Sequence, residues 1–270
     1  MKQFEIPCNF DKNFIGGLSE KIGLFPYIRF VYMAAWKDDG DNTRYSATFA
    51  AGYPATYDEY VLRIKLIQAM GLNVCILAQK NFTLETIEKY YDLGIRFFVM
   101  NNDALADTLK EKHDDITLIL SITRNLSMVD ICNKSNDFSM YDNIVLFHWF
   151  NRHLKEIKEL PKKYKYTIIP NSMCYYGCKW AATHWFAKGA TIEEYHKNVK
   201  WATDQCQPYL TDIQNTAYIE PENLHYFDDY IDCYKLVDRE WPTERILDDL
   251  QRYVERNPVV PRNEDFYKLP

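Results

Sequence analysis

Short apolar runs alternate with amphipathic segments along most of this chain. The apolar runs predict strands over residues 4–7, 27–33, 72–78, 95–100, 116–122, 143–148, 166–169 and 231–237. Apolar residues at three- and four-residue spacing predict helices over residues 56–70, 83–93, 103–112, 128–133 and 154–160. Gly71 and Gly94 follow two of these segments, where a glycine ends a helix.

This alternation of strand and helix is typical of a parallel sheet. Eight strand–helix units predict a (β/α)₈ TIM-barrel-like parallel barrel, regular or distorted, as a single domain over residues 1–257. The proline-containing segment 258–270 is predicted to be an extended C-terminal tail. A doubly wound open sheet is the alternative, but no glycine-rich phosphate fingerprint follows the first strand.

Composition and charge narrow the class of protein. Hydrophobic residues make up 47% of the 270-residue chain, which is a globular composition. The net charge of −6 gives no strong nucleic-acid signature. No apolar run approaches the roughly 20 residues that a membrane span needs. The N-terminus lacks the apolar core of a signal peptide, so a cytoplasmic location is expected.

Two of the seven cysteines, Cys174 and Cys178, form a CxxxC motif directly after the predicted strand 166–169. In the reducing cytosol an odd number of cysteines is weak evidence for disulfides. In a barrel this loop lies at the C-terminal face, where active sites form. With Cys206, the pair is predicted to bind zinc or an iron–sulfur cluster. Burial as small core residues, or a thiol nucleophile paired with His184, are the alternatives.

A fourth ligand is harder to choose. Strand periodicity places Cys233, Lys235 and Val237 on one face of the last strand, which favours Cys233. Cys8, at the end of the first strand, is the alternative fourth ligand. A radical-SAM motif is excluded, because it needs a third cysteine where this chain has Ala181.

The stretch NSMCYYGC, a later single cysteine, and YIEPENLHYFDDYIDCYKLVDR together resemble the peptidase U32 family. Related segments occur at 219–224 (IEPENL) and 234–239 (YKLVDR), and the opening IPCNFD also resembles the family. Asp238 and Asn223 depart from its pattern. The resemblance implies a barrel with a cysteine-bound [4Fe–4S] cluster. It also implies a part in oxygen-independent hydroxylation, with prephenate as the oxygen donor.

The implied cluster ligands are Cys174, Cys178, Cys206 and Cys233. Lys235 and Arg239 would bind a dicarboxylate, because an ammonium and a guanidinium suit carboxylates. His184 would donate a hydrogen bond to the cluster or the substrate. The acceptor, a small molecule or RNA, is unassigned, and a protein partner of the same family is expected. A peptidase or other hydrolase, and a non-enzymatic accessory subunit stabilised by zinc, are the alternative functions.

Overall fold

The computed structural model describes residues 2–39, 52–78, 81–178, 180–181, 213–237 and 241–257. Eight parallel strands pair in chain order and close into a barrel. Closure comes from β1, which pairs with both β2 and β8. The TIM-barrel prediction is therefore confirmed, and the open doubly wound sheet is excluded. The strands are β1 (Gln3–Pro7), β2 (Ile28–Ala34), β3 (Val74–Leu77), β4 (Phe97–Met100), β5 (Thr117–Leu120), β6 (Asn143–Val145), β7 (Tyr166–Ile168) and β8 (Cys233–Lys235).

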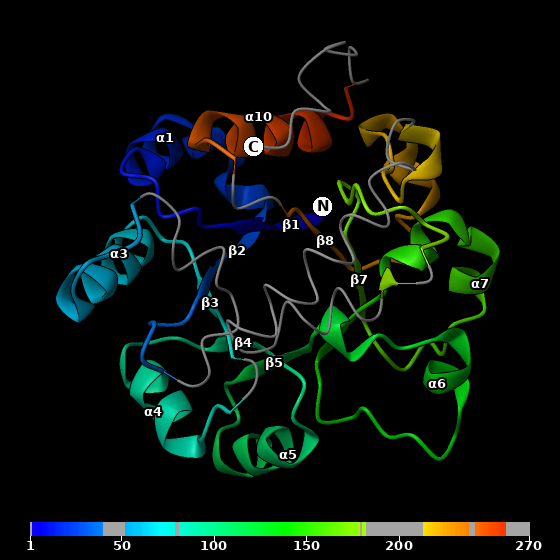
Figure 1. Ribbon diagram of the computed structural model, residues 1–270, viewed down its shortest axis with the longest axis horizontal. Coiled ribbons are helices and arrows are strands. Elements are labelled where there is room, and N and C mark those ends of the chain that lie inside the picture. The colour runs from blue at the N-terminus through cyan, green and yellow to red at the C-terminus, as the bar shows by residue number, and fades with distance from the viewer. Residues whose placement is uncertain are drawn as a thin grey trace.

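Helices form a ring outside these strands (Figure 1). The predicted helices are confirmed as α3 (Tyr57–Ala69), α4 (Leu84–Asp92), α5 (Asp103–Lys112), α6 (Met128–Cys132) and α7 (Leu154–Lys158). Two further helices, α1 (Phe14–Glu20) and α10 (Thr243–Glu255), were not predicted. Short 3-10 segments complete the described elements: η1 (Ile22–Tyr27), η2 (Ile122–Arg124), η3 (His148–Arg152), η5 (Ile213–Asn215) and η6 (Pro221–Tyr226).

Local sequence explains where several helices begin and end. Thr56 and Thr83 accept a backbone N–H at the start of α3 and α4, and Asn102 does so for α5. These side chains satisfy amides that have no partner within the helix. Gly71 and Gly94 have positive φ values of 78° and 83°, a conformation that glycine adopts without strain. Both glycines follow a helix, as predicted.

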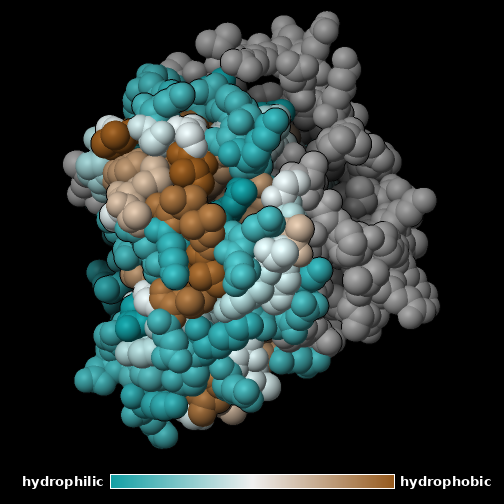
Figure 2. Space-filling model, turned by 90° about the vertical axis from the view of Figure 1, so that its left-hand side faces the viewer, coloured by the Kyte–Doolittle hydropathy of each residue, from teal (hydrophilic) through white to brown (hydrophobic). Residues whose placement is uncertain are grey.

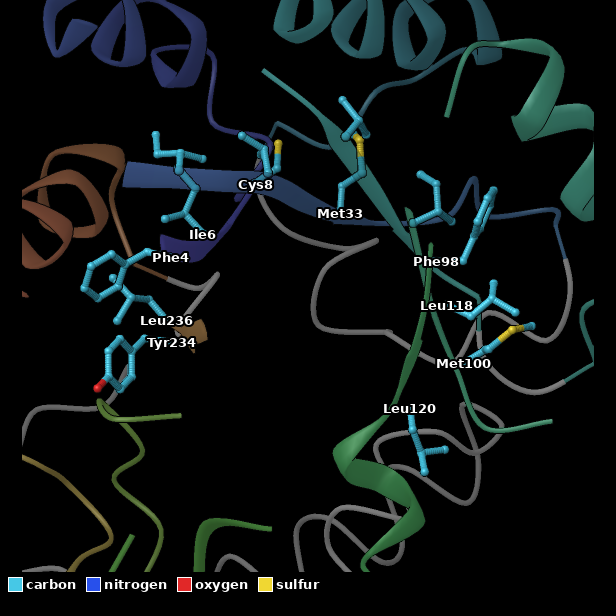
Figure 3. Packing of buried hydrophobic residues seen from close by; sticks show 14 of the residues in the cluster. Phe4, Ile6, Cys8, Met33, Phe98, Met100, Leu118, Leu120, Tyr234 and Leu236 are labelled. Atoms are coloured by element: carbon cyan, nitrogen blue, oxygen red, sulfur yellow. The ribbon is translucent and has the colours of Figure 1, made fainter. Parts of the chain in front are cut away.

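Alternation along the strands creates two apolar cores. One lies between the barrel and its helices and includes Phe4, Ile6 and Cys8, which follow one another at every second position (Figure 3). The other, here called the inner cluster, fills the barrel. It contains Phe30, Tyr32, Cys75, Leu77, Val99, Ile119, Ile122, Val145, Ile169 and Ala181.

A buried carboxylate interrupts the apolar interior of the barrel. Glu5 is fully buried and accepts contacts from Arg29 Nη1 at 3.2 Å and Lys235 Nζ at 3.4 Å. Burial opposes the charge on Arg29, but the nearby Glu5 and Cys233 outweigh it and raise the pKa of the guanidinium. One carboxylate therefore compensates two cations inside the barrel.

Part of the outer surface of the protein is apolar. Leu62 and Leu66 of α3 are 56% and 41% exposed. The face of the molecule on which α3 lies carries apolar side chains in a stripe (Figure 2). None of the helices in the described ranges is long and apolar enough to cross a membrane.

Replacing Glu5→Gln is expected to lower the free energy of unfolding by about 3–5 kcal/mol, because buried Lys235 and half-buried Arg29 lose their counter-charge. Urea unfolding measures this change. The matched control is Asp115→Asn, which removes an exposed carboxylate 2.7 Å from Arg96. That variant should cost much less, because solvent screens an exposed ion pair. Equal costs for the two variants would contradict the role given to Glu5.

Candidate functional site

The Cys174–Cys178 loop follows β7 and lies at the C-terminal mouth of the barrel, where the strands end. Cys174 and Cys178 are both half-buried, and both pack against the inner cluster. Val237, just beyond β8, packs against the same cluster. Cys174 and Cys178 thus contact the same apolar interior, and their role as ligands stays a prediction.

Backbone hydrogen bonds shape this loop. The N–H of Cys178 donates to Tyr175 O at 3.1 Å, and the N–H of Ala181 donates to Cys178 O at 3.1 Å. These bonds form two consecutive turns, over residues 175–178 and 178–181, which fold the backbone back on itself around Cys178. The loop is also anchored from outside, because Ala217 N donates to Cys174 O at 2.7 Å.

Asn171 ties the start of this loop to the neighbouring strand. Its Oδ1 accepts from Val237 N at 2.9 Å, and its Nδ2 donates to Val237 O at 3.2 Å. The side chain is buried, so these bonds are shielded from water. Asn171 therefore joins the ends of β7 and β8, which is more than the turn role that its residue type suggests.

The structure does not bring the two candidates for a fourth ligand to this loop. Cys233 is the first residue of β8, in register with Gln3 and Thr167, and its Sγ donates to Gln3 O at 3.2 Å. Burial, together with the charge of Glu5, raises the pKa of the Cys233 thiol, which opposes the thiolate that a metal needs. Cys8 packs in the outer core between barrel and helices (Figure 3).

Lys235 lies inside the barrel on the same face of β8 as Cys233 and Val237, as predicted. Its Nζ is 3.4 Å from Glu5 Oε2 and 3.8 Å from the centre of the Tyr32 ring. Glu5, Arg29 and Tyr32 were missed at the sequence level. The signal for Glu5 was present, because a charged residue between Phe4 and Ile6 must face the opposite side of its strand.

Three predicted site residues, Cys206, His184 and Arg239, lie outside the described residues. Within the described ranges, no group of three or more His, Cys, Asp or Glu side chains is arranged to hold a metal ion. The described part of the site therefore supplies two thiols, Cys174 and Cys178, and one interior ammonium, Lys235.

Comparisons with known proteins give no family. No protein-family model matches the chain. No curated protein matches it. Among solved structures, it is similar to tryptophan synthase from M. tuberculosis, with a TM-score of 0.46 and 6% identity over 93% of this chain and 88% of that one. A GH113 beta-1,4-mannanase gives a TM-score of 0.41 and 14% identity, with 91% and 92% covered.

A third similar structure is a conserved protein from Enterococcus faecalis with an unknown function. Its TM-score is 0.42 at 12% identity, covering 94% of this chain and 65% of that one. Similarities of this size carry no argument about activity. The fold assignment rests on the strand pairing itself.

Asp249 of α10 lies behind the site and contacts it through Asn171. Burial raises the pKa of Asp249 to about 6, and Asp248 adds to the rise. Arg252, Arg245 and the hydrogen bond with Asn171 act in the opposite direction. The carboxylate is thus charged at neutral pH at a cost in stability.

Asp249→Asn is expected to stabilise the protein by about 1–3 kcal/mol at pH 8, because the folded-state pKa exceeds the unfolded value near 3.9. The folded state then binds the proton more tightly, so wild type gains stability as the pH falls from above 6 towards 4. The difference between variant and wild type should shrink over that window. Urea unfolding from pH 4 to 8 measures it.

Asp248→Asn is the matched control for this prediction, because its side chain is 48% exposed. Its effect on unfolding should be small, because water solvates an exposed carboxylate well. A difference for Asp249→Asn that stays constant between pH 4 and 8 would rule out the raised pKa.

Proposed function

We propose that this chain is a barrel enzyme that binds an iron–sulfur cluster at its C-terminal mouth through Cys174, Cys178 and Cys206. The observation that carries the proposal is the shared position of Cys174 and Cys178. One loop presents both thiols, and both pack against the inner cluster beside the end of β8. Two soft donors held on one loop are a common starting point for a zinc or iron–sulfur site.

The donor chemistry fits a cluster better than a hard metal ion. Thiolates select soft ions and iron–sulfur clusters, whereas magnesium and calcium need several oxygen ligands. Half-buried thiols beside an apolar surface also suit a cluster, whose potential depends on burial and hydrogen bonding. Cys206 would add a third thiolate. Cys233 and Cys8 are not included, because Cys233 lies at the start of β8 and Cys8 lies in the core between barrel and helices.

Cys174, Cys178 and Cys206 would hold a [4Fe–4S] cluster, which would supply an iron able to bind an oxygen-bearing ligand. The interior of the barrel complements such a ligand by charge. Arg29 and Lys235 place two cationic groups beside the carboxylate of Glu5 inside the barrel. Cationic groups in a poorly solvated interior attract anionic ligands.

The resemblance to the U32 family extends this proposal to oxygen-independent hydroxylation. A dicarboxylate such as prephenate would be the oxygen donor, bound by Lys235 and Arg239, with His184 donating a hydrogen bond. The acceptor would be a small molecule or an RNA base, and a protein partner of the same family would complete the system. Among the described residues, the positive charge of Lys235 supports only the anion-binding part.

The rival functions use the same two thiols differently. A zinc ion held by four N or S ligands would stabilise the loop without catalysing a reaction. A thiol hydrolase would use Cys178 as a nucleophile with His184 as its base. The two rivals differ from a cluster in colour, in metal content and in sensitivity to chelators.

Anaerobically purified wild-type protein is expected to be brown and to contain roughly four iron and four sulfide per chain. Cys174→Ser, Cys178→Ser and Cys206→Ser should each lose most of the iron, because each removes one thiolate. Iron and sulfide analysis with visible spectroscopy measures this loss. Cys132→Ser, at an exposed cysteine on α6, is the matched control and should keep its iron.

Cys233→Ser and Cys8→Ser should also keep their iron, because neither side chain lies at the loop. Colourless protein with one zinc per chain would contradict the iron–sulfur cluster and indicate a structural zinc ion. Peptide cleavage that survives chelators and disappears in Cys178→Ala would favour the thiol hydrolase.

A further inference from the structure

Two segments far apart in the sequence frame the cysteine loop. Residues 215–219 run antiparallel to residues 170–176, with a bridge between Tyr175 and Thr216. Ile219 N donates to Pro170 O at 2.8 Å, and Tyr176 N donates to Asn215 O at 3.2 Å. The position of Cys174 therefore depends on how these two segments are held relative to each other.

Asn151 joins both segments from a third element. It belongs to η3, which follows β6, and its side chain is buried. Its Nδ2 donates to Ile169 O and to Ala217 O, each at 2.7 Å. Because both partners are carbonyl oxygens, the orientation of the amide is fixed. A carboxylate would repel both carbonyls, and an apolar side chain would leave both without this donor.

The Oδ1 atom of Asn151 shows that this side chain acts as a hydrogen-bond donor rather than an acceptor. Asn151 Oδ1 is buried and has no hydrogen-bond partner among the described residues. A buried acceptor without a partner is unfavourable, so the two short bonds from Nδ2 must offset that cost. The next residue adds a second link, because Arg152 Nε donates to Thr216 O at 2.9 Å.

We infer that Asn151 is a positioning residue for the Cys174–Cys178 metal site. This inference rests on the proposed function of that loop. Asn151 would act without touching the metal, by fixing the separation of residues 169 and 217 and with it the backbone of Cys174. Outer partners of this kind commonly change metal affinity about 10–100-fold.

The test is a titration of metal-free protein with cobalt(II) alone, followed by the thiolate-to-cobalt charge-transfer absorbance. Asn151→Ala is expected to weaken cobalt binding at least about tenfold. Asn143→Ala is the matched control, because Asn143 is also a buried asparagine. It is the first residue of β6, and its Oδ1 accepts a hydrogen bond from Thr167 Oγ1 at 2.7 Å within the barrel strands. That variant should bind cobalt within about twofold of wild type. Urea unfolding of the metal-free variants shows whether the two are similarly destabilised.

Equal cobalt affinity in Asn151→Ala and Asn143→Ala would overturn the positioning role while leaving the metal site intact. Wild-type protein that takes up neither cobalt nor iron would instead overturn the proposed function, and the inference with it. If Asn151→Ala does not fold, Arg152→Gln is the second variant, because this side chain is exposed. It should weaken cobalt binding by at least about threefold, and unchanged affinity would overturn the inference.

Discussion

The hydrogen-bonded ladder between β1 and β8 places Gln3 beside Cys233 and Glu5 beside Lys235. This pairing turns a row of parallel strands into a closed barrel and leaves no free edge in the sheet. It also encloses a carboxylate and two cations in a space from which water is largely excluded. Closure and internal charge compensation are therefore coupled, because the ion pair between Glu5 and Lys235 crosses the seam.

The adjacent pair of strands, β7 and β8, organises the candidate site. Asn171 extends the contact between β7 and β8 beyond their last paired residues. Its side chain forms hydrogen bonds with both the N–H and the carbonyl oxygen of Val237. Asn151 then joins the end of β7 to the returning segment at residue 217. Two buried amides thus hold a loop that contains no regular secondary structure. Together with the antiparallel hydrogen bonds to residues 215–219, these amides fix the backbone of the loop, as a ligand site requires.

Much of the fold was predictable because its signals are local. All eight strands and five helices follow from apolar periodicity, and Gly71 and Gly94 mark helix ends by their backbone freedom. Within the described ranges, two helices were missed for different reasons. In α1, Gly16 and Gly17 weaken the helical pattern. In α10 the pattern is clear, since Ile246, Leu247, Leu250 and Tyr253 are buried at helical spacing, and it was overlooked.

By itself, the sequence determined the strand–helix order, the shared face of Cys233, Lys235 and Val237, and the loop position of Cys174 and Cys178. These properties depend on neighbours within a few residues. Only the tertiary structure decided that Cys233 lies at the start of its strand against Gln3 and that Cys8 faces the helices. It alone placed Glu5 between two cations and Asn151 between two carbonyls. Such contacts join residues far apart in the chain, so no local pattern encodes the distances on which they depend.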